Sequence, residues 1–383
     1  MTQTAAETMI ELDRLTKRYP GQDHPAVTEL SMHIAAGEIV VFVGPSGCGK
    51  TTTMKLVNRL IEPSSGHIIM QGEDVTSVNP YQLRRRIGYV IQQGGLFPHM
   101  TIAENIATVP RMLGWDRGRI AERVEELLTL VGLDPGTFAG RYPKQLSGGQ
   151  QQRVGVARAL GADPPVMLLD EPFGAIDPVQ RENLQNEFLK LQGDIRKTII
   201  FVTHDIDEAI KMGDRIAILN TGAVVAQYDT PERILSDPAD EFVADFVGRG
   251  ASIRRLSLTR VKDADVPRWP TIDATADPSR ILDMARESEQ GWVILTDDAR
   301  RPVGWVPSVV AGTDTTMLTR GVPVTAEIRP EDTLFDALDG MLSSNRSATV
   351  VVDEDGLYRG VLDIETIRRL IHSSTATNGE TQP

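Results

Sequence analysis

Three short apolar runs stand out in the first two thirds of the chain. Residues 38–43 (EIVVFV) lie between two glycines, residues 166–170 (VMLLD) end in an aspartate, and residues 198–203 (TIIFVT) precede a histidine. Apolar runs of this length without polar alternation are typical of strands buried in a parallel sheet. The pattern predicts an α/β fold in which each buried strand is followed by polar residues.

Helical patterns alternate with these strands. Apolar residues recur at helical spacing in residues 52–60 (TTMKLVNRL), in residues 119–133 (RIAERVEELLTLVGL), and at Val154, Ala157 and Leu160. Beyond residue 270, two similar units follow each other, residues 276–306 and 328–362. Each has a Pro-led turn, an amphipathic helix, a β-branched strand, an acidic turn and a strand that carries a glycine, Gly304 or Gly360.

Composition bounds the class of protein. A chain of 383 residues is long for one core, so two domains are expected. No window approaches the roughly 18 apolar residues of a spanning helix, and the first residues lack the basic and apolar blocks of a signal peptide. One cysteine excludes an internal disulfide and fits a reducing compartment. The net charge of −13 disfavours a nucleic-acid partner.

A phosphate-binding loop follows the first strand. Residues 44–51 (GPSGCGKT) fit the pattern G-x-x-x-x-G-K-[ST]. In this pattern the loop amides converge on phosphate oxygens, Lys50 reaches the terminal phosphates and the Thr51 hydroxyl ligates Mg²⁺. The helix that follows adds the positive end of its dipole. The expected nucleotide-binding residues are Gly44, Pro45, Ser46, Gly47, Cys48, Gly49, Lys50, Thr51 and Thr52.

Polar residues at the ends of the other two strands complete a hydrolytic site. Asp170 is expected to hold Mg²⁺ through water, and Glu171 to act as general base toward the attacking water. His204 follows the third strand and is a candidate because parallel strands end at one edge of the sheet.

A second glycine-rich turn is not needed to bind the nucleotide of its own chain. Residues 146–150 (LSGGQ) open a helix and place free amides at its N-terminus, which favours an anion site. The phosphate loop already holds the chain's own nucleotide. We therefore expect Leu146, Ser147, Gly148, Gly149 and Gln150 to close over the γ-phosphate bound to a second copy, in a head-to-tail dimer.

With these motifs in combination, the chain resembles an ABC transporter ATPase over roughly residues 9–248. The resemblance implies that Tyr19 stacks on adenine, that Gln92 contacts Mg²⁺ and the attacking water, with Gln93 as its rival, and that Asp177 couples the two sites of a dimer. It also implies that His204 contacts the γ-phosphate. A helical subdomain over about residues 94–160 is implied, with a groove that receives a helix of a membrane permease. Leu96, Phe97 and Pro98 either line this groove or pack within the subdomain.

The second half resembles a tandem pair of CBS modules over residues 271–372. It is preceded by a linker or first strand at 249–270 and followed by a polar tail at 373–383. Nucleotide-binding modules carry a Ser/Thr followed three residues later by an Asp. Here the equivalent positions are Asp363 and Thr366, and Pro307 and Val310. This departure disfavours AMP or ATP as the regulatory nucleotide, and a cyclic dinucleotide at a dimer interface and no ligand both stay open.

A CBS pair behind an ABC ATPase is similar to the osmoprotectant importers that carry glycine betaine, carnitine or choline. The resemblance implies an ATPase on the cytoplasmic face of the inner or plasma membrane, with a permease as direct partner and a substrate-binding protein as indirect partner. The alternatives are an importer ATPase for another solute, such as an amino acid, and a soluble ABC ATPase without a transport role.

Overall fold

The chain folds into two compact units, Met1–Val247 and Gly248–Pro383. The structure is a computed structural model that describes residues 7–91, 95–174, 177–248, 250–309 and 321–376. Each unit buries its own clusters of apolar side chains. No helix in the described part of the chain is long and apolar enough to cross a membrane.

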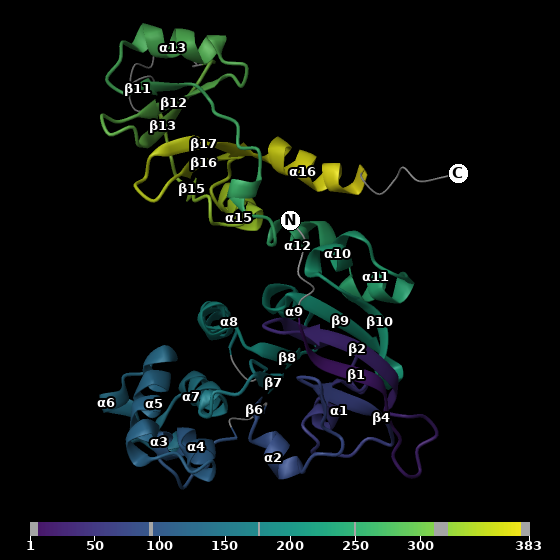
Figure 1. Ribbon diagram of the computed structural model, residues 1–383. Helices are drawn as coiled ribbons and strands as arrows, with labels where there is room; N and C mark the ends of the chain where they lie inside the picture. The colour runs from purple at the N-terminus through teal and green to yellow at the C-terminus, as the bar shows by residue number, and fades with distance from the viewer. Residues whose placement is uncertain (1–6, 92–94, 175–176, 249, 310–320, 377–383) are drawn as a thin grey trace. The chain divides into compact units, whose positions relative to one another are not determined.

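The first unit contains a six-stranded sheet and a four-stranded antiparallel sheet (Figure 1). The six-stranded sheet has the order β10-β9-β3-β8-β7-β6, and all its neighbours are parallel except β9 and β10. Its strands are β3 (Ile39–Val43), β6 (Ile87–Val90), β7 (Val166–Asp170), β8 (Thr198–Val202), β9 (Arg215–Asn220) and β10 (Val224–Asp229). The antiparallel sheet has the order β2-β1-β4-β5, with β1 (Thr8–Lys17), β2 (Val27–Ala35), β4 (Ser65–Met70) and β5 (Glu73–Asp74).

The three apolar runs of the sequence are central strands of the parallel sheet, as predicted. Every residue of β3 and β8 is buried, and so are the first four of β7. One cluster joins both sheets to helix α1 (Lys50–Val57) through Leu12, Phe42 and Met54. Burying each such side chain contributes roughly 1.5–3 kcal/mol, which fixes the strand ends that carry polar groups.

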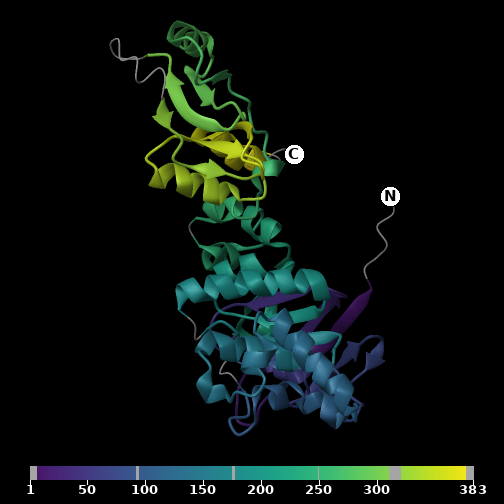
Figure 2. The same ribbon diagram turned by 90° about the vertical axis from the view of Figure 1, so that its left-hand side faces the viewer.

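The helices between residues 102 and 160 gather beside the six-stranded sheet, a position visible in both ribbon views (Figures 1 and 2). They are α3 (Ile102–Ile106), α4 (Thr108–Met112), α5 (Arg117–Leu130), α6 (Pro135–Phe138) and α7 (Gly148–Leu160). The other helices of this unit are α2 (Pro80–Arg84), α8 (Pro178–Ile195), α9 (Ile206–Met212), α10 (Pro231–Ser236) and α11 (Glu241–Val247).

The second unit repeats one supersecondary pattern twice. Each repeat has a parallel strand pair flanking a helix, then an antiparallel strand. The first consists of β11 (Thr271–Asp273), α13 (Pro278–Glu287), β12 (Trp292–Thr296) and β13 (Pro302–Pro307), joined by β14 (Val322–Pro323). The second consists of β15 (Glu327–Ile328), α15 (Leu334–Ser343), β16 (Ala348–Val352), β17 (Tyr358–Asp363) and α16 (Ile364–Ala376). Trp305 and Val350 share one buried cluster, so the repeats pack together.

The start and the end of the second unit differ from the expectation. Residues expected to form a linker or first strand contain helix α12 (Ala251–Leu256), which starts at Gly250 in a left-handed conformation with φ 99°. Leu256 is buried against α15 and belongs to the core of the second unit. Helix α16 also continues to Ala376, into the segment expected to be a polar tail.

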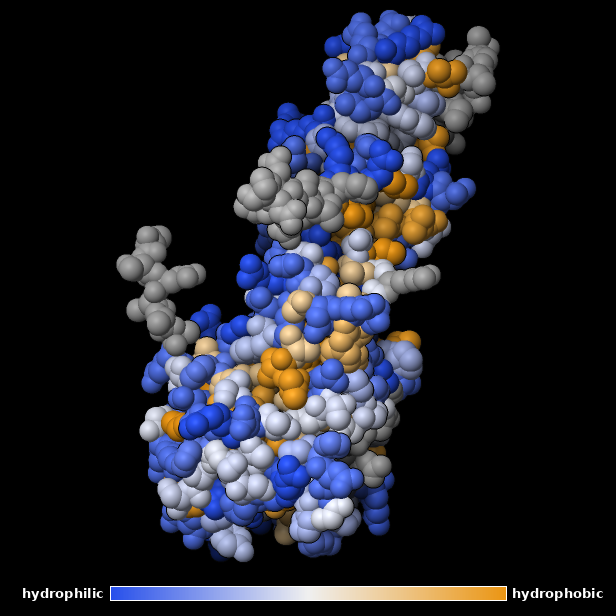
Figure 3. Space-filling view, turned by 90° about the vertical axis from the view of Figure 1, so that its right-hand side faces the viewer, coloured by the Kyte–Doolittle hydropathy of each residue, from blue (hydrophilic) through white to orange (hydrophobic). Residues whose placement is uncertain are grey.

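Apolar side chains also reach the surface of the second unit, where Leu342 is 65% exposed and Phe335 41% exposed on the same helix. Figure 3 shows hydrophobic residues gathered on one face of this unit. Exposed apolar side chains that cluster in this way are typical of interaction surfaces.

Candidate functional site

Strand register brings the predicted catalytic residues to one edge of the parallel sheet. Phe42 pairs with Val202, and Val202 pairs with Asp170, so three neighbouring strands are level at their carboxyl ends. The phosphate loop, His204 and Glu171 follow these positions directly. This edge is where open α/β sheets bind ligands.

The phosphate loop is closed on itself around the ammonium group of Lys50. The Nζ atom of Lys50 donates to the carbonyl oxygens of Gly44 (2.7 Å) and Pro45 (3.0 Å), and lies 3.9 Å from Sγ of Cys48. The Cys48 side chain is buried, whereas residues 45–47 are exposed. A buried ammonium group held by two carbonyl oxygens and a thiol sulfur suits an incoming anion such as a phosphate.

Two of the loop glycines are required by the fold. A Cβ at Gly44 would lie 2.1 Å from the carbonyl oxygen of Leu219, and one at Gly49 would lie 2.5 Å from the carbonyl oxygen of Ala26. Gly49 also has φ +114°, which side chains rarely adopt. The backbone can approach a phosphate closely only where these side chains are missing.

Gly49→Ala should therefore destabilise the protein by about 2–4 kcal/mol and weaken ATP binding, because overpacking and an unfavourable φ add up. Thermal unfolding with and without ATP measures both effects. The matched control is Gly72→Ala: Gly72 has φ +76° with no atom within 4 Å of its Cβ position, so only the backbone cost of about 1–2 kcal/mol remains. Equal losses for the two variants would contradict the steric argument.

Asp170 and Thr51 form a pair of hard oxygen donors beside the loop. The Thr51 hydroxyl donates to Oδ1 of Asp170 at 3.1 Å. Burial raises the pKa of the Asp170 carboxyl, and burial next to this carboxylate raises the pKa of Tyr89 to about 12. A hydroxyl and a carboxylate at this spacing fit Mg²⁺, which takes one or two protein ligands and otherwise water and phosphate oxygens.

Glu171 and His204 are brought together from two neighbouring strands. Nδ1 of His204 lies 3.3 Å from Oε1 of Glu171, with the histidine side chain 62% exposed and the glutamate side chain 23% exposed. Glu171 has φ 44°, a left-handed conformation that ordinarily favours glycine or asparagine. Backbone strain of this kind concentrates at functional sites.

Residues 146–150, here called the signature loop, cap their own helix α7, and Gly148 faces open space. The Ser147 hydroxyl accepts from the amide of Gln150 (3.3 Å), and the Gln150 side chain accepts from the amide of Ser147 (3.0 Å). The amides of Gly148 and Gly149 have no acceptor within the helix. A Cβ at Gly148 would meet nothing within 4 Å, and one at Gly149 would make ordinary contacts of 3.5 and 3.6 Å. Neither glycine is required by the fold of its own chain.

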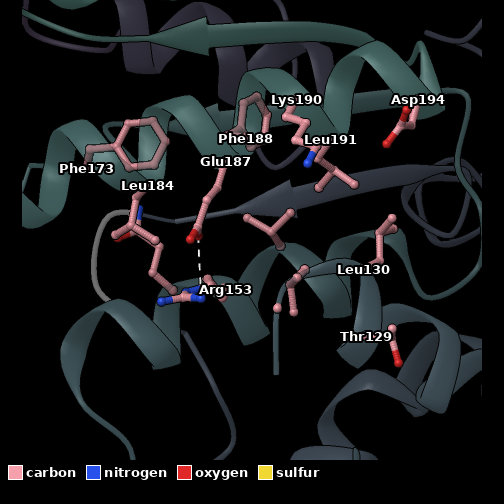
Figure 4. A pocket seen from close by; sticks show the side chains of 14 residues that line it. Thr129, Leu130, Arg153, Phe173, Leu184, Glu187, Phe188, Lys190, Leu191 and Asp194 are labelled. Atoms are coloured by element: carbon pink, nitrogen blue, oxygen red, sulfur yellow. Dashed lines mark ion pairs between the residues drawn. The ribbon is translucent and has the colours of Figure 1, made fainter. Parts of the chain in front are cut away.

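A hollow of about 240 Å³ lies between α5, α7 and α8, close to the signature loop. Figure 4 shows its apolar wall from Leu184, Phe188 and Leu191 on α8. The ion pair between Arg153 and Glu187 (3.4 Å) bridges α7 and α8 at its rim. These two residues and Leu184 also line a second hollow that contains Ser147, Gly149 and Gln150.

Tyr19 and Asp177 lie at the margins of the site. Gln92 and its rival Gln93 fall outside the described residues. Tyr19 is half-buried just beyond β1, with Nζ of Lys17 5.2 Å from its ring centroid. Asp177 is exposed and caps α8 by accepting from the amide of Gln180 at 3.1 Å.

Sequence reasoning missed the residues that shape the loop after β6. Asn105 is fully buried; its side chain accepts from the amide of Phe97 (2.8 Å) and donates to three carbonyl oxygens of the loop. Arg158 of α7 donates to the carbonyl of Gly95 and lies 5.8 Å from the Phe97 ring centroid. Of the two alternatives left open for these residues, exposure holds for Phe97 and Pro98, whereas Leu96 is half-buried. The signal available in the sequence was an asparagine in a helix that follows a loop with glycine and proline; its burial is seen only in the structure.

The phosphate loop, the three strand ends and the signature helix define an ATP-binding cassette of the ABC transporter class. Residues 27–174 match the ABC transporter family and residues 322–373 match the CBS domain family. The CBS match covers the second repeat of the second unit.

Several relatives match along nearly their whole length. The osmoprotectant import ATP-binding protein OsmV of Salmonella typhimurium is 46% identical over 95% of this chain and 97% of the relative. The choline transport ATP-binding protein OpuBA of Bacillus subtilis is 43% identical over 96% of this chain and 97% of the relative. The chain therefore belongs to the ATP-binding subunits of the quaternary-amine importers within the ABC transporter family.

Solved structures agree with the first unit. The dimeric cassette MJ0796 is 34% identical with a TM-score of 0.52, covering 58% of this chain and 98% of that one. CbiO1 of Clostridium perfringens is 25% identical with a TM-score of 0.57, covering 66% and 95%. The predicted fold is confirmed, and the protein is an ATPase coupled to transport.

Proposed function

We propose that this chain hydrolyses ATP in a head-to-tail dimer, with each site built from the phosphate loop of one copy and residues 146–150 of the other. The observation that carries the proposal is the open space at Gly148, an exposed glycine that the chain's own fold does not require. Free amides at the start of α7 would bind the γ-phosphate of the facing copy. Dimeric structures of the related cassette MJ0796, one in a post-hydrolysis state with ADP and phosphate, support the formation of a dimer.

Within each site we assign the chemistry to the level strand ends. Glu171 would orient and deprotonate the attacking water, and His204 would contact the γ-phosphate. Nδ1 of His204 lies 3.3 Å from Oε1 of Glu171, and this contact supports these roles because both side chains could then reach the γ-phosphate and the attacking water together. Mg²⁺, which neutralises phosphate charge when bound, would be held by Thr51 and Asp170, with Gln92 as a further ligand. Tyr19 would stack on the adenine, and Asp177 would contact the second copy.

The loop of residues 95–98 is the proposed contact with a permease. Asn105 and Arg158 hold its backbone, while Phe97 keeps 40% of its surface exposed. An exposed ring on a fixed loop is typical of the centre of an interface. Through Arg158 the loop is joined to α7, so movement of the signature helix and of a docked permease would be linked. This contact would place the chain on the cytoplasmic face of the membrane.

Phe97→Ala should release the chain from its permease and leave ATP binding by the isolated chain unchanged. Loss of a central aromatic side chain typically costs at least about 2 kcal/mol of binding, or roughly thirtyfold in affinity. Co-purification of the permease with a tagged chain tests this. Tyr81→Ala is the matched control, because Tyr81 is 72% exposed on α2, outside the loop. Full retention of the permease by Phe97→Ala would refute the assignment.

The proposed solute is a quaternary amine such as glycine betaine, carnitine or choline. The relatives OsmV and OpuBA, named for osmoprotectant import and choline transport, support this class. So does the glycine betaine/carnitine/choline transport ATP-binding protein OpuCA of Bacillus subtilis, which is 50% identical over 78% of this chain. Another relative, the spermidine/putrescine import ATP-binding protein PotA of Chromobacterium violaceum, is 43% identical over a shorter match, 63% of this chain and 65% of the relative. Uptake of labelled glycine betaine, choline, putrescine and an amino acid by cells with and without the chain separates these solutes. Uptake of an amino acid or polyamine alone would contradict the proposal, and chain-dependent ATPase activity without any uptake would favour a soluble ATPase.

The second unit is the proposed site of regulation. The carboxylate of Asp363 accepts from the amide of Thr366 (2.7 Å), and Arg369 donates to the Thr366 hydroxyl (3.1 Å). These groups therefore stabilise the start of α16, and a ribose at this place would have to displace them. A regulatory nucleotide between the repeats remains a proposal, which binding of AMP, ATP and cyclic dinucleotides to the full-length chain would test.

A further inference from the structure

One buried polar contact joins the two helices that begin at the nucleotide edge. Nε2 of Gln185 on α8 donates to Oε1 of Glu208 on α9 at 3.0 Å. The two residues are only 6% and 8% exposed. Neither belongs to a motif of the hydrolysis site, so their function is not explained by the roles assigned above.

The Glu208 end of the contact is tied to the strand end that carries His204. Asp205 caps α9 by accepting from the amide of Glu208 (3.3 Å), and its own amide donates to the Thr203 hydroxyl (3.1 Å). The amide of Thr203 in turn donates to the carbonyl of Phe42 at the end of β3. Glu208 is therefore fixed relative to both His204 and the phosphate loop.

The Gln185 end is tied to the surface beside the signature loop. Gln185 is part of α8, which starts at Asp177 and contributes Gln180, Asn183 and Leu184 to the hollow that contains Ser147 and Gly149. A rotation or slide of α8 would move this whole surface. The contact with Glu208 limits such a movement relative to His204.

Burial of these two polar side chains would destabilise the fold if their hydrogen bond were not formed. Desolvation raises the pKa of the Glu208 carboxyl, while hydrogen bonds from Thr203 and Gln185 act in the opposite direction. Two helices could be held together by apolar side chains without a buried carboxyl. A directional bond instead specifies one position of α8 along α9.

We propose that Gln185 and Glu208 are a positioning pair that holds α8 in register with the strand end carrying His204, and that hydrolysis requires this register. The inference rests on the proposed hydrolytic site. It predicts that loss of the pair lowers kcat while ATP binding to the phosphate loop is retained, because the loop is fixed by other contacts.

The first test compares two glutamines of the same helix in the full-length chain. Gln192 is 8% exposed and donates to the carbonyls of Lys197 (2.6 Å) and Gly37 (3.3 Å), far along α8 from Asp177. Gln185→Leu and Gln192→Leu should lower the Tm similarly. Only Gln185→Leu should lower kcat, by about tenfold or more, with KM for ATP within about twofold. Equal kcat values for the two variants would overturn the proposal.

The second test exchanges the two side chains. Gln185→Glu alone places two carboxyl groups in buried contact and should lower kcat at least about tenfold, because one must stay protonated or move away. Adding Glu208→Gln restores a donor and an acceptor in reversed positions and should return kcat to within about threefold. A double variant no better than Gln185→Glu would overturn the pair.

Glu171→Gln, measured in parallel, separates this inference from the assignment of the general base. Full hydrolysis by Glu171→Gln would remove that assignment, yet rescue by the exchanged pair would still support the positioning role. Loss of hydrolysis in Glu171→Gln without rescue by the exchange would leave the base assignment standing and overturn the pair.

Discussion

Replacement of Glu171 by glutamine should lower steady-state ATP hydrolysis by about a thousandfold and leave ATP binding nearly unchanged. A positioned general base contributes about 10²–10⁴-fold, and the amide keeps the size of the side chain while removing its basicity. Because hydrolysis would no longer dissociate the composite sites, ATP-bound dimers should accumulate. Phosphate release and size-exclusion chromatography with and without ATP measure the two effects.

A second histidine–carboxylate pair of the cassette provides the control. Asp74 lies 2.8 Å from Nδ1 of His67 on β4 and β5, in the antiparallel sheet. Asp74→Asn removes this pair and should leave hydrolysis within about twofold, since exposed ion pairs contribute little. Hydrolysis at the original rate by Glu171→Gln would show that another group activates the water.

Gly148→Asp should abolish ATP-driven dimerisation while leaving the isolated chain as stable as before or slightly more stable. Space around Gly148 is open, so the side chain fits. An acidic group in the first turn of α7 is favourable for the helix by about 0.3–1 kcal/mol. The same charge would repel a γ-phosphate, so stability and activity should change in opposite directions. Thermal unfolding and ATP-dependent chromatography separate them.

The control here is Gly140→Asp, which also enters open space on the surface but lies outside the signature loop. It should leave dimerisation intact. Mixing then tests which copy the loop serves. Lys50→Ala and Gly148→Asp chains should each be inactive alone, but their mixed dimer retains one complete composite site and should hydrolyse ATP. A mixture as inactive as its components would mean that the loop acts within its own chain.

The sequence predicts the nucleotide edge well because each of its parts is local. The runs around Val41, Leu168 and Ile200 are apolar throughout, which only buried strands tolerate, and each is followed directly by its polar residues. Parallel pairing of these strands then brings their carboxyl ends to one edge of the sheet. The ABC transporter family was likewise identified from contiguous motifs, LSGGQ and GPSGCGKT, and the importer subfamily from the CBS pair that follows them.

The parts that the sequence could not predict depend on distant partners or on weak local signals. In α12, Ile253 and Leu256 are too few to separate a helical period from a strand, and burial of Leu256 against the second unit settles the outcome. Gln185 and Glu208 look like surface residues of two helices until the fold brings them together. The left-handed backbone of Glu171 has no sequence signature either, because the residue is not glycine.

The lone thiol of the chain has a practical consequence for spectroscopy. Cys48 is the only cysteine and is buried at 2% exposure within the phosphate loop, so reagents should reach it slowly. A cysteine introduced at an exposed position such as Gly140 would react first and carry a spin label with little background. In a symmetric assembly of two chains, such a label would report a single distance between copies during each step of the transport cycle.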